Sequence, residues 1–438
     1  MNLAQQIIPV HPDALNLHQH EIGVRRREKI QSLFARIDGM TFVPATTKVV
    51  AEHRREADIA VYDENFCAHT NKFAANLQKF LHMCKKNRNF AAKKKKNTMS
   101  KILLISTGGT ITMVRDAVSG ALVPADMETF KAFMPELSAG DFQVEIQAFT
   151  PLIDSSDIGP AIWEQMARTV YDHYDEYDGF VILHGTDTMS YSASALSFML
   201  ENLGKPVVFT GSQLPVGVLR SDAKENLLTA IEIAAAKDEE GNAIVPEVTI
   251  YFEDRLFRAN RTTKRNAEHF SAFNSYNYPA LAKAGVHITY LPHLVRYSDP
   301  TKPLTLHTAF DTNVAVLKLF PGIQPAVVRA LLRTRGLKGV VLETFGAGNA
   351  PSDKWLYREL KAAVDRGIII VNKTQCNTGS VEMGLYAVSL NLMKAGVLSG
   401  HDITTEALLT KMMLLLGEQP ENAKELLCKD LCGEMTID

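Results

Sequence analysis

The amino-acid sequence predicts an α/β protein of two α/β domains, a larger N-terminal domain on a parallel sheet and a smaller C-terminal one. Three observations lead to this prediction. Short apolar runs recur from residue 100 onward, stretches with helical periodicity separate most of them, and a Pro-rich stretch at 295–311 interrupts the alternation. Continuous Val, Ile and Leu runs between helices are typical of parallel strands buried on both faces of a sheet.

The expected strands and helices alternate along the chain. The strands are expected at 102–105, 180–183, 206–209, 248–252, 315–319, 339–342 and 368–371. Helical periodicity predicts helices at 160–173 and 191–203, and further helical segments at 405–416 and 420–432. The Pro-rich stretch marks a domain boundary, so we expect an N-terminal domain at 99–295, a linker at 296–312 and a C-terminal domain at 313–438.

Residues 1–98 differ in character from the rest and form an N-terminal extension of unknown role. They are polar and end in KKNRNFAAKKKKNTMS, in which the like-charge block at 93–96 should stay solvated. The extension can be read as a linker after an N-terminal module, as a nucleic-acid-binding tail, or as sequence from an upstream reading frame. We favour the last interpretation, in which Met99 is the start of the protein.

Composition excludes several classes of protein. Hydrophobic residues make up 46% of the chain, charged residues 22%, and the net charge is −2, so nothing attracts the protein to nucleic acid or to a membrane surface. No apolar run approaches the roughly 18 residues that span a bilayer, and the N-terminus lacks signal-peptide features.

Five scattered cysteines do not form a disulfide framework, which favours the cytoplasm. Cys428 and Cys432 are expected to pack on the helix at 420–432 rather than bind a metal, and no metal site is expected elsewhere.

Polar loops follow the expected strands at their carboxyl ends, the edge where open α/β sheets bind ligands. Hydroxyl groups dominate these loops, and they also contain Asp187 and Lys264. The loops lie at 107–110, 150–157, 184–189, 210–213 and 258–264.

The first loop, TGGT, has neither the spacing of a dinucleotide-binding turn nor the Lys of a P-loop. Its two glycines allow positive φ and a close approach of backbone to a ligand, and its threonines offer hydroxyls at a strand end. A hydroxyl is a weak nucleophile without a neighbouring base, and a lysine can be that base. A carboxylate beside the lysine can bind an amino group. The loops together therefore suit hydrolysis of a small zwitterionic amide.

Several stretches resemble the L-asparaginase family of the bacterial cytoplasmic type. They are TGGTI at 107–111, HGTDTM at 184–189, RTTK at 261–264, and the longer stretches at 177–213 and 374–387. The resemblance covers about residues 100–438. It implies a cofactor-free enzyme that acts on L-asparagine, with a catalytic domain at 99–295. It also implies a site completed by a neighbouring subunit, and hence a homodimer or homotetramer.

The resemblance assigns roles residue by residue. Thr110 matches the nucleophile, while Thr186, Asp187 and Lys264 match a second triad for proton transfer. Asp187 also matches the residue that takes the substrate's α-ammonium group. The α-carboxylate binder is Ser155, with Asp154 and Ser156 around it, and the amides of Gly109 and Thr186 are the expected oxyanion donors.

Simpler interpretations stand beside these roles. Asp187 is also suited to cap the helix that follows it, and Lys264 to lie on the surface. His184 is expected to pack at the strand end rather than bind a metal, because no second histidine lies at ligand spacing. Thr107 is expected to support the turn.

The sequence departs from the family in two places. The loop after TGGT, residues 114–126, contains no tyrosine to cover the site, and Leu122 lies near the expected position. Residues resembling the second, regulatory asparagine site of some members are Thr263, Asn349, Thr374 and Cys376. However, Glu343 replaces the arginine of regulated members, so we expect no cooperativity. Cys376 is otherwise expected to be a small buried residue.

Two other functions stay open at this point. A subunit of a tRNA-dependent amidotransferase would reuse the same domain to release ammonia, and residues 1–98 keep that alternative alive. A non-catalytic asparagine sensor would keep the fold without the chemistry. Ammonia release from free asparagine distinguishes asparaginase activity from both.

Overall fold

The computed structural model describes residues 99–115, 120, 122–124, 127–138, 142–384 and 387–437. The N-terminal extension at 1–98, with its lysine block, lies outside the described residues, and so does part of the loop at 114–126. The described residues belong to one compact unit. No helix among the described residues is long and apolar enough to cross a membrane.

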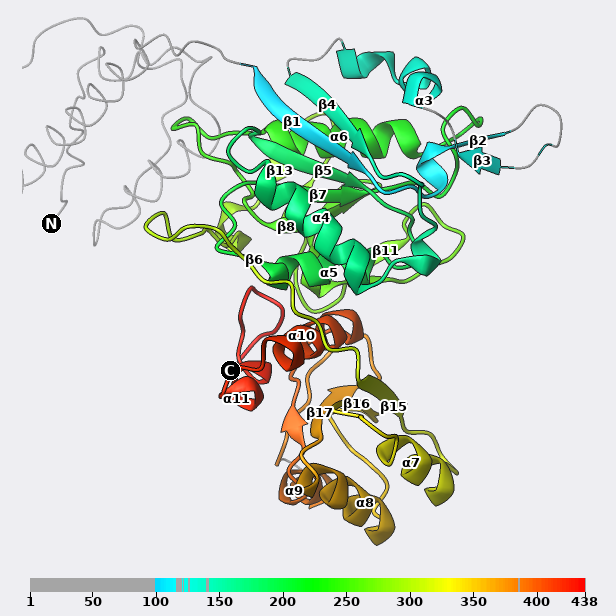
Figure 1. Ribbon diagram of the computed structural model, residues 1–438, viewed down its shortest axis with the longest axis vertical. Coiled ribbons are helices and arrows are strands. Elements are labelled where there is room, and N and C mark those ends of the chain that lie inside the picture. Colours follow the sequence, from blue (N-terminus) through cyan, green and yellow to red (C-terminus); the bar gives the residue numbers. More distant parts are fainter. Residues whose placement is uncertain are drawn as a thin grey trace, which may run out of the picture. The chain divides into compact units, whose positions relative to one another are not determined.

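An eight-stranded mixed sheet organises the first part of this unit (Figure 1). Its strand order is β13-β12-β9-β8-β7-β5-β1-β4, and the pairs from β4 to β8 are parallel. The strands are β1 (Ser100–Ser106), β4 (Phe142–Ala148), β5 (Gly179–Leu183), β7 (Val207–Thr210), β8 (Val248–Phe252), β9 (Arg255–Arg258), β12 (Ala282–Lys283) and β13 (Thr289–Tyr290).

The sequence predicted a parallel sheet. This is confirmed for the strands from β4 to β8, whereas the other edge of the sheet is antiparallel. β9 pairs antiparallel with β8, and β12 and β13 continue the antiparallel edge. A two-residue connection at Glu253 and Asp254 joins β8 to β9, too short for the crossover that a parallel pair needs. The edge strands are also short and partly polar, so they lack the apolar runs that identified the central strands.

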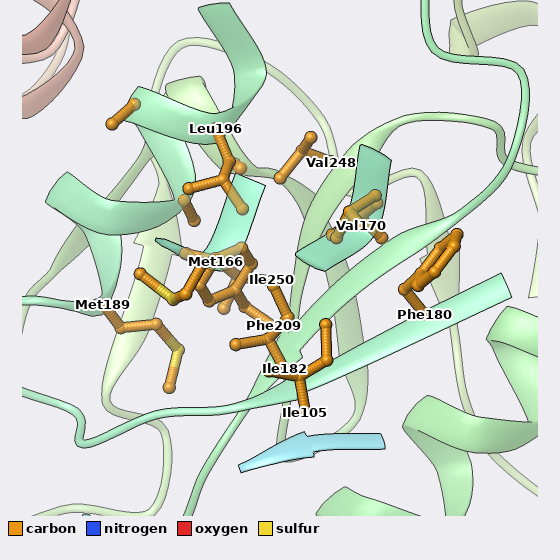
Figure 2. Packing of buried hydrophobic residues seen from close by; sticks show 14 of the residues in the cluster. Ile105, Met166, Val170, Phe180, Ile182, Met189, Leu196, Phe209, Val248 and Ile250 are labelled. Carbon is orange, nitrogen blue, oxygen red and sulfur yellow. The ribbon is translucent and has the colours of Figure 1, made fainter. Parts of the chain in front are cut away.

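Helices cover both faces of this sheet. α4 (Pro160–Asp172) and α5 (Met189–Met199) lie on one face, and α6 (Ala223–Ala235) on the other (Figure 1). α3 (Met127–Phe133) contributes Phe130 to the core on the α6 side. Strand residues alternate between the two cores: Ile105 packs toward α4 and α5, and Leu104 toward α6. Figure 2 shows the first of these cores, where Met166 and Leu196 lie against Ile182 and Phe209.

A second, four-stranded parallel sheet follows, with the order β15-β16-β17-β18. Its strands are β15 (Val314–Lys318), β16 (Gly339–Thr344), β17 (Ile369–Thr374) and β18 (Leu398–Ser399). Its helices are α7 (Pro325–Leu332), α8 (Lys354–Asp365), α9 (Ala387–Lys394) and α10 (Thr405–Glu418). The first three lie on one face of this sheet and α10 on the other, where α10 also packs against α5 (Figure 1).

Short elements complete the described chain. β6 (Leu200–Glu201) pairs with β14 (Thr305–Leu306), β10 (Thr262–Lys264) with β11 (Phe273–Ser275), and β2 (Met113–Arg115) with β3 (Leu122–Pro124). The 3-10 turns are η2 (Thr110–Thr112), η3 (Pro135–Ser138), η4 (Ser155–Asp157), η5 (Ala259–Arg261) and η6 (Pro292–Leu294).

The expected helix at 420–432 is wrong in extent. α11 covers only Ala423–Leu427, with Cys428 as its C-cap, so Cys428 and Cys432 do not share a helix. Beyond it, Glu434 accepts hydrogen bonds from the backbone amides of Leu431 and Cys432 and pairs with Lys411, with both side chains 0% exposed. These tertiary contacts hold the tail in a non-helical path. Within the described residues no cluster of three His, Cys, Asp or Glu side chains could hold a metal ion.

Candidate functional site

The TGGT turn is shaped by contact with two neighbouring loops. Gly108 and Gly109 have φ of +125° and +88°, a region that side chains rarely adopt. A Cβ on Gly108 would lie 2.5 Å from the Ile153 carbonyl oxygen, and one on Gly109 would lie 2.5 Å from the Gly185 nitrogen. The two glycines are therefore needed because backbone packs directly on backbone here.

The loops at 154–156 and 184–188 are joined to each other in a similar way. A Cβ on Gly185 would lie 2.5 Å from the Ser155 hydroxyl oxygen, and the Thr188 hydroxyl donates to the Ser155 carbonyl at 2.6 Å. Asp154 accepts hydrogen bonds from the amide and hydroxyl of Ser156, both at 2.8 Å, and these bonds lower the pKa of its carboxyl group. The buried Ser155 thus lies where the three loops meet.

Lys264 brings two of the predicted site residues together. Its ammonium group donates to the Thr186 hydroxyl at 2.8 Å and to the Asp187 carboxylate at 2.6 Å. The Lys264 side chain is 18% exposed and that of Asp187 is 66% exposed. Lys264 is therefore not a surface lysine, and it reaches the site from the β10–β11 ribbon rather than from a strand of the main sheet.

Gln213 is a site residue to which the sequence analysis gave no role. The Thr186 hydroxyl donates to its side-chain oxygen at 3.1 Å, while its side-chain nitrogen donates to the carbonyls of Ala267 and His269 at 3.2 Å. With Lys264 donating to the same oxygen of Thr186, the direction of the hydroxyl proton is determined. Gln213 lies in the loop after β7, at the same edge of the sheet as the other site residues. This position is the feature of the sequence that could have marked Gln213 as a site residue.

Thr110 follows Gly109 directly, and Thr186 follows Gly185. Because these two glycines are in contact, the two threonines emerge from touching turns. In the described part of the chain, the Thr110 hydroxyl and the amides of Gly109 and Thr186 have no hydrogen-bond acceptor or donor assigned to them. These groups are available to a substrate.

Of the simpler interpretations, helix capping by Asp187 is wrong, whereas packing of His184 and support of the turn by Thr107 are confirmed. The N-cap of α5 is Thr188, and no side chain caps this helix; the Asp187 carboxylate instead pairs with Lys264. His184 is fully buried at the end of β5, as expected, and burial lowers its pKa to about 4. The Thr107 hydroxyl donates to the Leu183 carbonyl at 2.9 Å and so supports the turn.

One of the residues expected at a second site, Thr263, lies beside α10. The Thr263 hydroxyl, one residue before Lys264, hydrogen-bonds to the buried Glu406 at the start of α10. Burial raises the pKa of Glu406, and the Thr263 hydrogen bond opposes that shift. Burial also raises the pKa of Tyr191 to about 12, with the charges of Glu406 and Glu343 adding to it.

Glu343 is surrounded by cations. Lys373 lies beside it across the β16–β17 pair, and the Lys318 ammonium is 3.3 Å from its carboxylate, which also accepts a hydrogen bond from Thr405 at 2.8 Å. Burial lowers the pKa of Lys373, while the charges of Glu343 and Glu406 oppose the shift. Thr374 follows Lys373 and accepts its hydrogen bond through the carbonyl at 2.7 Å.

Cys376 and Asn349 are the two remaining residues that were expected at the second site. Cys376 is exposed rather than buried, because it lies in the turn beyond the end of β17, where its amide bonds to the Thr374 hydroxyl. Asn349 lies in the loop after β16, and its shielded side-chain oxygen has no partner among the described residues. Of the loop at 114–126, the backbone of Leu122 is described, in β3 opposite Arg115.

Comparison with known proteins gives consistent matches. The family model "Asparaginase, N-terminal" matches residues 101–296, and "Glutaminase/Asparaginase C-terminal domain" matches residues 313–426. L-asparaginase 1 of Escherichia coli is 45% identical over 345 residues, which cover 77% of this chain and 98% of that protein. The 60 kDa lysophospholipase of Mus musculus is 42% identical over 77% of this chain and 63% of its own length. The crystal structure of L-asparaginase I from Vibrio cholerae aligns with a TM-score of 0.71 and 42% identity, covering 78% of this chain and all of that one.

Proposed function

Since the chain belongs to the asparaginase family, we propose that it hydrolyses L-asparagine to L-aspartate and ammonia. The observation that carries the proposal is the set of hydrogen bonds from Lys264 to Thr186 and Asp187, next to the turn that presents Thr110. A hydroxyl nucleophile, a second hydroxyl, a lysine and an exposed carboxylate suit a small zwitterionic amide.

Binding of the substrate uses both of its charges. The Asp187 carboxylate is exposed enough to take the α-ammonium group while it keeps its bond to Lys264. Ser155 offers its hydroxyl to the α-carboxylate, and Asp154 and Ser156 shape the turn that presents it. These contacts orient the side-chain amide toward Thr110.

The first half of the reaction forms a covalent intermediate. The Thr110 oxygen attacks the amide carbon, and the amides of Gly109 and Thr186 hold the oxyanion. The C–N bond then breaks, and the hydroxyl proton that Thr110 gave up passes to the leaving nitrogen, which departs as ammonia. An acyl ester of Thr110 with the aspartyl group remains.

The second half hydrolyses that ester. Water attacks the acyl carbon and gives a proton to the Thr186–Lys264–Asp187 set. The set returns a proton to the Thr110 oxygen as the ester bond breaks, which releases aspartate and the free Thr110 hydroxyl. The Lys264 ammonium donates to both Thr186 and Asp187, so hydrogen bonds connect these three side chains for the transfer of that proton.

The proposal also covers the domains of the chain and its oligomeric state. We infer that residues 99–295 form the catalytic domain and that the site is completed by a neighbouring subunit in a homodimer or homotetramer. Sedimentation of the purified protein tests the assembly, and a monomer with full activity contradicts it.

The direct test is ammonia release from free L-asparagine by the purified full chain and by a chain that begins at Met99. We expect ammonia release by both at equal rates, none with Thr110→Ala, and no release of fatty acid from a lysophospholipid. Absence of release from free asparagine favours the amidotransferase subunit or the sensor. Loss of activity in the shorter chain alone shows that residues 1–98 are a working module.

A further inference from the structure

A chain of buried hydrogen bonds ends on the peptide group between Gly185 and Thr186. The Trp163 indole nitrogen, on α4, lies 3.0 Å from the Ser192 hydroxyl on α5. This hydroxyl is 2.8 Å from Nε2 of His184, and Nδ1 of His184 is 2.7 Å from the Gly185 carbonyl oxygen. The side chains that form this chain are buried.

The direction of every bond in the chain follows from its two ends. The indole N–H can only donate, and the carbonyl oxygen can only accept. Nδ1 of His184 must therefore carry a proton. Burial lowers the pKa of His184 to about 4, so the ring is neutral near pH 7, and Nε2 accepts the hydroxyl proton of Ser192. All of the donated protons point along the chain toward the Gly185 carbonyl.

The other end of this peptide group belongs to Thr186, whose hydroxyl accepts a hydrogen bond from Lys264 in the candidate site. The Gly185 carbonyl and the Thr186 N–H belong to one planar unit, so a hydrogen bond to the carbonyl fixes the direction of the N–H. The same bond polarises the amide and makes its N–H a stronger donor. Within the described residues, no protein acceptor occupies the Thr186 amide.

We propose that His184 is a positioning residue that orients the Gly185–Thr186 peptide group and strengthens the Thr186 N–H as an oxyanion donor. Ser192 and Trp163 select the imidazole tautomer that makes this possible. The inference rests on the proposed function, because the oxyanion is that of the amide substrate. His184 itself touches no substrate, since both ring nitrogens are engaged in the core.

Two substitutions at His184 separate positioning from simple packing. The side-chain amide of His184→Asn can place its nitrogen where Nδ1 lies and so keeps a donor for the Gly185 carbonyl. His184→Phe keeps the buried ring and removes the donor. A lost oxyanion donor costs about 10²–10³ in rate, so a weakened one in the Phe variant should lower kcat about tenfold or more, with little change in KM. The Asn variant should keep most of kcat despite filling the core less well.

A packing role predicts the reverse order, because the Phe variant fills the core better than the Asn variant. Melting temperatures of both variants show whether activity follows stability. Thr344→Val is the matched control, since it removes an equally buried hydroxyl that donates to the Asn372 side-chain oxygen at 2.7 Å in the second sheet. We expect the control to keep the wild-type kcat. Equal kcat in the Phe and Asn variants, or parallel loss of kcat and melting temperature, overturns the proposal.

Nitrogen NMR of the imidazole gives a readout independent of turnover. The His184 signals, identified by their absence in His184→Phe, should show a protonated Nδ1 and an unprotonated Nε2 at pH 7. The opposite tautomer overturns the proposal. Absence of ammonia release by the unmodified protein would reject the proposed function and the oxyanion role of Thr186 with it, while the NMR result still decides whether His184 donates to Gly185.

Discussion

Lys264 donates hydrogen bonds to two consecutive residues of one loop, Thr186 and Asp187, so a change in any of these three side chains affects the positions of the other two. Thr186 also donates to Gln213, so its hydroxyl is held from two sides. Thr110, in contrast, makes no hydrogen bond to the described residues through its hydroxyl. In the proposed reaction, the Thr110 hydroxyl attacks the substrate and the Thr186 hydroxyl serves proton transfer.

The two threonines should be separately essential. We expect Thr110→Ala and Thr186→Ala each to abolish turnover without changing the melting temperature, because each removes a hydroxyl and little packing. Residues that act as a unit are non-additive, so the double variant should lose no more than the worse single variant. Steady-state rates and thermal melts check this, and a double variant that loses the sum of two large effects contradicts a shared site.

Asp187 should affect substrate binding through charge. Asp187→Asn removes the anion that pairs with the α-ammonium group, and a charge-assisted hydrogen bond of about 1.5–3 kcal/mol corresponds to a KM increase of roughly tenfold or more. An asparagine analogue without the amino group should bind the wild type and the variant similarly, as measured by competition. If both ligands lose the same affinity, Asp187 is not the ammonium partner.

At the scale of elements, the site depends on loops that touch through glycine. Gly109 of the TGGT turn packs on Gly185 of the next loop, and that loop packs on Ser155 of a third. Strand ends alone would bring these loops near one another, but the close backbone contacts determine how Thr110 and Thr186 are presented.

Gly109→Ala should disrupt this contact. Its new Cβ would lie 2.5 Å from a backbone nitrogen, which cannot move aside as a flexible side chain can. Gly322→Ala is a matched control, because Gly322 has the same φ of +88° with nothing within 4 Å. Gly109 also has a ψ of 174°, a combination with positive φ that is essentially restricted to glycine. We therefore expect loss of both melting temperature and activity in Gly109→Ala, and a smaller loss of melting temperature with no loss of activity in Gly322→Ala. Equal activity in both variants contradicts the role of the contact.

The C-terminal tail is held to α10 by a fully buried ion pair. The Lys411 ammonium lies 2.6 Å from the Glu434 carboxylate, and both side chains are 0% exposed. Nearby, Arg261 donates to the Gly433 carbonyl at 2.6 Å and to Asp402 at 2.7 Å. The tail therefore contacts the turn that precedes Lys264.

Glu434→Gln should destabilise the fold strongly, because it removes the only carboxylate paired with the buried charge of Lys411 among the described residues. Breaking a buried pair in this way typically costs about 3–5 kcal/mol in the free energy of unfolding. Urea denaturation measures it. Glu425→Gln, which removes the exposed pair with Lys429, should leave the midpoint unchanged. A Glu434→Gln midpoint equal to that of the wild type would show that the pair contributes nothing.

At the scale of the whole described molecule, a polar cluster links the helices of the two sheets. Thr263 bonds to Glu406 of α10, and Tyr191 of α5 lies close enough to be affected by the charges of Glu406 and Glu343. Thr263 and Lys264 are consecutive residues of β10, so a ligand that contacts Thr263 would lie one residue along the chain from the candidate site.

We expect no cooperativity in asparagine, since Glu343 puts a carboxylate where regulated members have a cation. The rate should depend hyperbolically on asparagine over two decades around half-saturation, and Glu343→Arg should be the variant in which a sigmoidal curve could arise. Lys318 and Lys373 flank Glu343 and are the groups that would bind a second α-carboxylate if this expectation fails. A Hill coefficient clearly above one in the unmodified protein, lost in Lys373→Met, would contradict the prediction and assign that role to Lys373.

The sequence by itself determined the central strands and the location of the site. β1, β5 and β8 are mostly apolar, because a strand covered on both faces of a sheet has no polar side that faces water. The polar loops that follow them had to share one edge, since parallel strands all end on the same side of a sheet. Thr186 and Asp187 could therefore be grouped with Thr110 before any coordinates.

Only the tertiary structure decided the rest, because those features depend on contacts between residues far apart in the chain. The short strands β9, β12 and β13 carry no apolar run of their own and form by pairing with β8 and with one another. Helical periodicity extended α11 too far because it contains no information on the Lys411–Glu434 pair. The roles of Gln213 and His184 likewise follow from hydrogen bonds across three elements, and local sequence patterns do not record which partners a buried polar group will meet.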